Sequence, residues 1–379
     1  MIDTVILQIT IGFSAIINPK RFDPPIENWI LSFGGYRKFI NNPTETDEIK
    51  WGYCPRLTLY QRGKMFTLKI EFSAPKMFFR GDNINELKES DFIGIIDRLR
   101  EVAKGMGVLL TIEQIKRAEV FGFHPSKNII LGNYYNSTLV IWELKKVDIS
   151  RKFDIDCKAY RNGGEVLQFY TNLHGLSLYD KIRDLKKPAK RAFDKDQTAQ
   201  QLSLFDALSG KVEILRIEAR LKKKKFEDIF KKIGYDNFNP TFEDVFNKDL
   251  CQKILRYYWN YFFKDNMFLF DMRNSPQKIL NIVLAKYKDK KIPLYKLLGT
   301  AMLILCSKDE EGTIGLKNLI ELYKPKNNWS KIKKWLEDFK KDLNKSYLHS
   351  FIKDIETQID EFKPFRIEED EAKTYPLDM

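Results

Sequence analysis

A strict two-residue alternation between apolar and charged side chains marks the stretch 214–221, which reads ILRIEARL. Alternate positions are apolar at Leu215, Ile217, Ala219 and Leu221, and charged at Arg216, Glu218 and Arg220. Side chains along a strand point in turn to the two faces of a sheet, so this pattern predicts one buried and one polar face. The stretch 66–72 repeats it, with Thr67, Lys69 and Glu71 on the polar side. Strands of this kind favour an antiparallel sheet with a second layer on one face.

Other segments fill in the sheet and its partner layer. Residues 56–60 and 65–73 predict a hairpin around Gly63, which can supply the positive φ that a tight turn requires. Apolar residues at helical spacing predict a helix over 91–104, ended by Gly105 and Gly107. Further strands are expected near 2–9, 107–112, 118–123, 138–144, 175–182 and 213–221.

From about residue 226 the apolar spacing becomes helical, most clearly over 327–344. We therefore expect an α+β fold: a mainly antiparallel sheet domain with helices on one face over 1–225, then a helical domain over 226–365. Residues 366–379 are acidic and are expected to form a flexible tail. The basic, turn-rich stretch 186–210 is interpreted as a long connection with a functional role.

The excess of 13 positive charges favours a polyanionic partner such as nucleic acid, although it is equally typical of a soluble surface. The four cysteines are scattered without a CxxC pair, which argues against a zinc cluster. No secretory signal and no 18-residue apolar run is present in the sequence, so we expect a cytoplasmic location and no membrane partner.

Five segments occur in an order that resembles a known family. They are MIDTVILQI at the start, IEFSAPKMFFRGDN (70–83), KRAEVFGF (116–123), LSLYDKI (176–182) and ILRIEARL (214–221). Together they resemble the gene II/X replication proteins of filamentous phages and, more distantly, staphylococcal rolling-circle plasmid initiators. The resemblance covers about residues 1–225. It implies a nuclease domain that nicks one DNA strand at an origin, holds the 5′ phosphate on a tyrosine and later rejoins the strand.

The resemblance also implies residue roles. Tyr179 matches the nucleophile of a Tyr-x-Lys motif, and Lys181 matches its lysine. The acidic positions that would bind metal fall on Asp3, Glu71, Glu119 and Glu218. The basic pair of the last strand falls on Arg216 and Arg220. At the third acidic position relatives commonly carry Asp, so Glu119 is one methylene longer than the pattern.

The chemistry of these residue types fits such a reaction. A tyrosine hydroxyl has a pKa of about 10, so it needs a nearby cation or base to act as a nucleophile at neutral pH. Carboxylate ligands favour Mg²⁺ or Mn²⁺, which would polarise the scissile phosphate. The sequence holds only His124, His174 and His349, with no His-x-His pair. We interpret His124 and His174 as structural or DNA-contacting residues.

Basic residues near these motifs are candidate DNA contacts. Lys76 lies in the 73–83 segment, which is interpreted equally well as a phosphate-contacting loop or a plain connection. Lys222, Lys224 and Lys225 follow the Glu218 strand directly, where contact with the DNA backbone is favoured over a solvated surface.

The predicted function is therefore a rolling-circle initiator that acts on an origin duplex and its displaced single strand, with a helicase and polymerase of the host. One alternative is a mobilisation relaxase with the same chemistry. The other is a non-enzymatic origin-binding protein that has kept the fold.

Overall fold

A computed structural model describes most of the chain. The described residues are 1–27, 35–131, 136–147, 157–161, 166–185, 212–264, 283, 291–306, 312–324, 329–334 and 350–367. The expected connection at 186–210 and most of the expected helix at 327–344 lie outside these residues; within the latter, residues 329–334 are helical.

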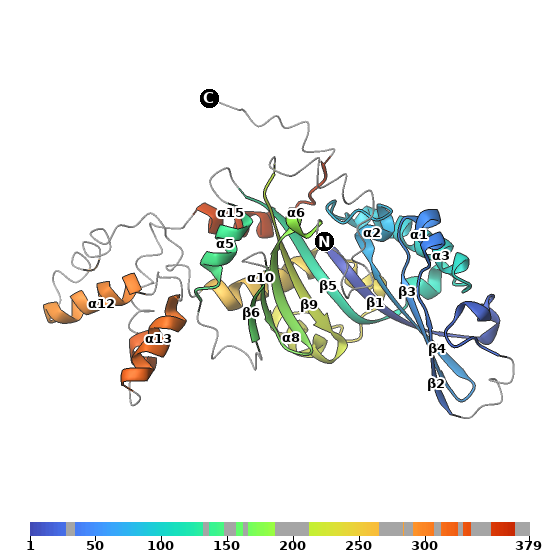
Figure 1. Cartoon of the computed structure of the whole chain (residues 1–379), viewed down its shortest axis with the longest axis horizontal. Coiled ribbons are helices and arrows are strands. Elements are labelled where there is room, and N and C mark those ends of the chain that lie inside the picture. Colours follow the sequence, from blue (N-terminus) through green and yellow to red (C-terminus); the bar gives the residue numbers. More distant parts are fainter. Residues whose placement is uncertain are drawn as a thin grey trace.

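One nine-stranded antiparallel sheet forms the centre of the molecule, in the order β2-β3-β4-β1-β5-β9-β8-β7-β6 (Figure 1). The strands are β1 (Ile2–Ile11), β2 (Tyr36–Asn41), β3 (Arg56–Arg62), β4 (Met65–Ser73), β5 (Glu119–Ile130), β6 (Cys157–Arg161), β7 (Val166–Tyr170), β8 (His174–Asp180) and β9 (Ile214–Lys222). The α+β fold expected from the alternating segments is confirmed.

The helices complete the fold. They are α1 (Glu45–Trp51), α2 (Ala74–Phe78), α3 (Phe92–Gly105), α4 (Ile112–Lys116), α5 (Ser137–Leu144), α6 (Lys181–Asp184), α8 (Phe226–Ile233), α9 (Phe242–Val245), α10 (Lys248–Phe263), α12 (Leu294–Cys306), α13 (Gly312–Tyr323) and α15 (Ser350–Glu361). No helix among the described residues is both long enough and apolar enough to cross a membrane.

The predicted hairpin at 56–73 and the predicted helix at 91–104 are both present. Arg62 pairs with Met65 where β3 turns into β4, and Gly63 has the positive φ that the turn needs, at 59°. The helix expected over 91–104 is α3, whose Ile95, Ile96 and Leu99 are buried. Their three- and four-residue spacing places them on one helix face, toward the core.

Two predicted strands are wrong. Residues 138–144 form helix α5, because Asn136 caps its first turn by accepting a hydrogen bond from the Leu139 amide at 2.7 Å. A short apolar run does not distinguish a buried strand from a buried helix by periodicity alone. Residues 107–112 form only an isolated bridge between Ile16 and Val108 before α4 begins.

Helices α8, α9, α10 and α15 pack on the sheet and share its hydrophobic core, whereas no described residue of α12 or α13 belongs to that core. Phe226 of α8 lies 5.5 Å from Phe123 of β5, ring centre to ring centre, and Phe262 of α10 stacks on Phe169 of β7 at 4.4 Å. Gln358 of α15 exchanges two 2.8 Å hydrogen bonds with the backbone of Ile130. The core of the sheet therefore continues past the predicted boundary at 225/226, through α8, α9, α10 and α15.

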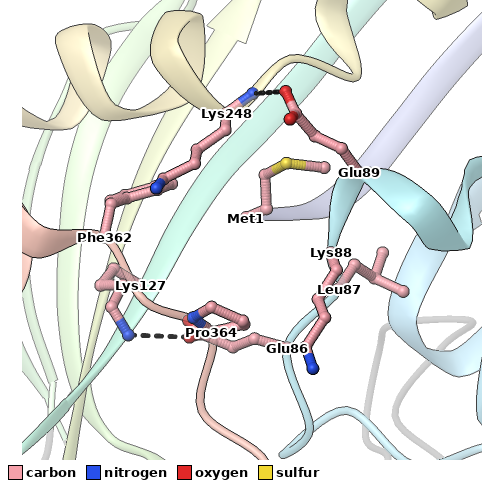
Figure 2. Close-up of a pocket in the computed structure, with 9 residues that line it drawn as sticks. All are labelled: Met1, Glu86, Leu87, Lys88, Glu89, Lys127, Lys248, Phe362 and Pro364. Atoms are coloured by element: carbon pink, nitrogen blue, oxygen red, sulfur yellow. Dashed lines mark hydrogen bonds and ion pairs between the residues drawn. The ribbon is translucent and has the colours of Figure 1, made fainter.

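The segment after α15 is also anchored on the sheet. The buried Glu86 carboxylate accepts hydrogen bonds from Lys127 Nζ at 2.8 Å and from the amides of Asn128 and Phe365 at 2.6 and 2.8 Å. Figure 2 shows the adjoining pocket between the start of β1, residues 86–89 and residues 362–364. Arg366 pairs with Asp91, so the predicted flexible tail begins with an anchored residue.

His174 provides a test of this packing. Its Nδ1 lies 2.7 Å from the Tyr258 hydroxyl in the interface between β8 and α10. Burial, followed by the charges of Lys225 and Lys232, lowers the pKa of His174 to about 4. The unfolded chain therefore takes up a proton between about pH 6.5 and pH 4, while the folded chain does not. The stability that this neutral histidine contributes is complete above pH 6.5 and is lost as the pH falls toward 4.

We expect the free energy of unfolding to drop more steeply between pH 7 and pH 5 in the wild type than in His174→Gln, which cannot be protonated. Urea unfolding followed by circular dichroism at several pH values measures both curves. Parallel curves for the two proteins would contradict the buried neutral histidine.

Candidate functional site

The polar face of β8 and β9 carries the predicted nucleophile. Tyr179 pairs with Arg216, and Ser177 pairs with Glu218, across these neighbouring strands. The apolar positions between them are buried under the helices, so the alternation predicted for 214–221 is confirmed. We call the side chains gathered here the Tyr179 cluster. It consists of Asp3, His124, Tyr179, Lys181, Arg216, Glu218 and Arg220.

Glu218 is the centre of the hydrogen bonding in the Tyr179 cluster. The Tyr179 hydroxyl donates to Glu218 Oε2 at 3.1 Å. The other carboxylate oxygen, Oε1, lies 3.1 Å from His124 Nδ1 and 2.9 Å from Arg220 Nε. Burial acts to raise the pKa of Glu218, but the charges of Arg220, His124 and Arg216 outweigh it and hold the pKa well below its usual range.

The Tyr179 hydroxyl is held protonated in this arrangement. Burial, and then the negative charge of Glu218, raises the pKa of Tyr179 well above its usual value, while the charge of Arg216 opposes the shift. A phenol next to a carboxylate does not ionise until further positive charge approaches it or the carboxylate accepts its proton. The resting hydroxyl is therefore oriented but not activated.

Arg216 joins four parts of the fold around the Tyr179 cluster. It is almost fully buried, with 1% of its side chain exposed. One Nη donates to the carbonyl of Asn83 at 2.8 Å, and the other donates to Ser126 Oγ at 3.0 Å and lies 3.4 Å from Asp3 Oδ1. Ser73 Oγ donates to the same Asp3 oxygen at 3.2 Å. Arg216 is thus a buried cation, rather than the exposed DNA contact expected from the sequence.

Lys181 lies over the ring of Tyr179, although it belongs to α6 and not to the strand. The strand ends one residue earlier, because Asp180 caps α6 by accepting a hydrogen bond from the Arg183 amide at 2.9 Å. Lys181 Nζ is 5.9 Å from the centre of the Tyr179 ring, and the described residues offer it no hydrogen bond or ion pair. Burial, followed by the charge of Arg216, lowers the pKa of Lys181 to about 8.

The predicted convergence of four carboxylates is wrong. Glu119 pairs with Lys223 and lies seven residues along β5 from Ser126, the partner of Glu218; this is roughly 20 Å at the rise of a strand. Glu71 pairs with Lys69 at 3.1 Å, on a strand separated from β9 by β1 and β5. The sequence pattern places each carboxylate on the polar face, but strand register sets their spacing.

A preformed metal centre is therefore not assembled from these carboxylates. No group of three or more His, Cys, Asp or Glu side chains is placed to hold a metal ion within the residues that the structure describes. Asp3 and Glu218 remain near one another but are each engaged by an arginine. His124 and Glu218, which are 3.1 Å apart, are two side chains of metal-binding type that lie beside the Tyr179 hydroxyl.

The sequence reasoning missed the role of β5 in the site. The predicted strand ended at Phe123, whereas β5 continues to Ile130 and brings His124 and Ser126 into contact with Glu218 and Arg216. An available signal was parity, since positions 124, 126 and 128 are all polar. Pro125 obscured it, because proline is confined to edges, ends and bulges of sheets. The register shifts where β1 meets β5 accommodate it.

The remaining predicted DNA contacts differ in exposure. Arg220 has 48% of its side chain exposed beside Glu218, and Lys222 and Lys224 are exposed where β9 ends. Lys225 pairs with Asp228 at 2.7 Å. Lys76 is buried in α2 over the Tyr53 ring, and not in an exposed loop as one interpretation of the 73–83 segment required. Its charge helps to lower the pKa of Lys181.

A scan against protein-family models, a search of curated proteins and a search of solved structures each found no match for this chain.

The two arginines of β9 form a matched pair for mutation. Arg216→Met would leave Asp3 and the Asn83 carbonyl without their partner, and we expect a loss of about 3–5 kcal/mol in the free energy of unfolding. Arg220→Met, on the same strand face but half exposed, should cost less, because His124 stays beside the Glu218 carboxylate. Urea unfolding at neutral pH measures both. Equal losses would show that Arg216 is not the buried support of the site.

Proposed function

We propose that this chain is a rolling-circle replication initiator, a single-strand DNA endonuclease and strand-transferase that forms a 5′-phosphotyrosine link through Tyr179. The observation that carries the proposal is the half-buried Tyr179 side chain, whose hydroxyl donates to Glu218 and which lies beside the cations of Lys181 and Arg216. A tyrosine that merely fills a sheet surface does not need buried cations beside its ring. The five segments that resemble phage and plasmid initiators support the same function.

The proposed reaction follows from the roles that these side chains can take. The Tyr179 oxygen attacks the scissile phosphorus, and the bond from phosphorus to the 3′ oxygen breaks. Glu218 orients the hydroxyl and accepts its proton, which is then available to the departing 3′ oxygen. Lys181 offers ammonium donors that no described residue occupies, so it can bind a phosphate oxygen as charge accumulates.

Rejoining reverses these steps. The tyrosine is the leaving group when a 3′ hydroxyl attacks the phosphotyrosine, so the bond energy is conserved and no ATP is needed. Mg²⁺ or Mn²⁺ stays part of the proposal on the family resemblance alone. The described residues contain no group of three or more potential metal ligands, so no step above is assigned to the ion. The exposed Arg220, Lys222 and Lys224 would neutralise phosphates of the origin duplex.

The proposed setting is a host cytoplasm, where the released 3′ hydroxyl primes a host polymerase and a host helicase separates the strands. A mobilisation relaxase would use the same chemistry at a transfer origin. Supercoiled plasmids carrying the DNA that flanks the gene, incubated with the protein and Mn²⁺, separate an enzyme from a binder. Nicked circles support the proposed enzyme, whereas a shifted but uncut band supports a non-enzymatic origin-binding protein.

Tyr179→Phe tests the nucleophile. The change removes one hydroxyl and keeps the ring under Lys181, so folding and DNA binding should persist while covalent adduct and strand joining disappear. Denaturing gels detect the protein–DNA adduct, and mass spectrometry of its peptides maps the linked residue. An adduct formed by Tyr179→Phe would overturn the assignment and make Tyr170 the next candidate.

Lys181 predicts a pH dependence. Its pKa of about 8 means that the free enzyme loses this cation as the pH rises through 8. We expect the rate of adduct formation at subsaturating DNA to fall above about pH 8, and Lys181→Arg to move that fall to higher pH because a guanidinium stays charged. Single-turnover rates from pH 6 to pH 10 measure this. An unchanged descending limb in Lys181→Arg would exclude Lys181 as its source.

A further inference from the structure

The far end of the polar sheet face carries exposed aromatic and basic side chains that the proposed chemistry does not use. We call Tyr36, Lys38, Tyr60 and Arg62 the hairpin patch. In the pairing of β2 with β3, Tyr36 lies opposite Arg62 and Lys38 opposite Tyr60, so an aromatic faces a cation in both pairs. The opposite face of the two strands carries the buried apolar pair Phe39 and Leu59, together with the polar pair Arg37 and Gln61.

The hairpin patch lies on the same sheet face as the Tyr179 cluster. Tyr60 pairs with Thr67 of β4, and the next position on that face of β4, Lys69, pairs with Gln8 of β1. The residues that alternate with them join the single core under the helices, as do Ile217 and Ala219 of β9. The hairpin patch and Glu218 therefore lie on the same face of the sheet. Figure 1 shows β2, β3 and β4 at one side of the molecule.

The geometry of the hairpin patch is that of a stacking platform. The rings of Tyr36 and Tyr60 are stacked, with centres 6.2 Å apart and planes at 23°. The Arg62 guanidinium lies 5.8 Å from the Tyr36 ring centre. Tyr36 is nevertheless 59% exposed, so part of its ring surface remains accessible to a further planar group. A plain cross-strand contact would explain the stacking but not the accompanying charge.

The charge of the surface around the hairpin patch indicates which planar group would stack there. On β2, β3 and β4 the polar face carries four cations, Lys38, Arg56, Arg62 and Lys69, against one carboxylate, Glu71. Stacked rings within a basic groove are the features that bind single-stranded nucleic acid, since every base has a π-face and every linkage a negative charge. We propose that the hairpin patch binds bases of single-stranded DNA that extends from the Tyr179 cluster. This proposal rests on the proposed function.

The spacing suits such a strand. β8 and β3 are five strand spacings apart in the sheet order, and Thr67 lies six residues along β4 from Ser73, which contacts Asp3. Strand geometry makes the separation of the two sites on the order of 30 Å. An extended single strand of several nucleotides spans that distance, so the patch would hold DNA well beyond the scissile phosphate.

The test is binding of the full chain to fluorescein-labelled oligothymidylate of about 20 nucleotides, followed by fluorescence anisotropy. Tyr36→Ala should weaken binding about tenfold by removing a stacked base, whereas Tyr36→Trp should retain it. Lys38→Ala should reduce the salt slope of log K by about 0.7. Tyr323→Ala is the matched control, since Tyr323 on α13 is 73% exposed and lies outside the sheet; its affinity should equal that of the wild type.

Unchanged affinity in Tyr36→Ala, or an equal loss in Tyr323→Ala, would overturn the proposal, and so would tighter binding of oligouridylate than of oligothymidylate. Circular dichroism confirms that each variant is folded. The readout is separate from the chemistry, because oligonucleotide binding is measured without nicking and Tyr179→Phe should still bind the oligonucleotide. Failure of the adduct in the wild type would reject the proposed enzyme without affecting the binding result.

Discussion

Burial of one face of the antiparallel sheet under helices is the constraint on which the rest of this structure depends. Apolar residues at every second position of β1, β4, β5, β8 and β9 meet α3, α8, α10 and α15 in a single core. Because strand side chains alternate, the same choice of apolar positions forces polar side chains onto the opposite face. The Tyr179 cluster and the hairpin patch are both on that face, so packing and proposed function have one origin.

Electrostatics around Tyr179 decide what that face can do. Asp3 is matched by Arg216, and Glu218 by Arg220 and His124. Lys181 is buried, and although the charges of Asp184 and Asp3 act to raise its pKa, burial and the charge of Arg216 lower it to about 8. An incoming phosphate would add negative charge beside it. At this point the charge of Arg216 already opposes the rise in the pKa of Tyr179.

Two residues near the end of the described chain support this site. Phe365 and Arg366 bind the 82–91 segment through Glu86 and Asp91. The Asn83 carbonyl in that segment accepts a hydrogen bond from Arg216, which holds Asp3 and Ser126. Residues more than 270 positions apart in the chain thus contact one another near the proposed nucleophile. The buried charged groups Glu86 and Arg216 connect these contacts to the Tyr179 cluster.

The spacing of residue types over short stretches was sufficient to predict the strand faces and the hairpin. Alternation predicts the faces of β4 and β9, and Gly63 predicts the hairpin. Each of these depends on residues close together in the chain. The strand predicted at 138–144 failed because an apolar run is ambiguous until a cap such as Asn136 is weighed.

Tertiary structure alone decided which charges meet. Register between β5 and β9 puts His124 against Glu218 and carries Glu119 away from it, and the strand order keeps Glu71 apart. No local pattern encodes that outcome, because register follows from packing of the whole apolar face, and a shift of one residue would turn every polar side chain inward. The sequence by itself determined which residues lie on the open face of the sheet. Only the folded sheet determined their neighbours there.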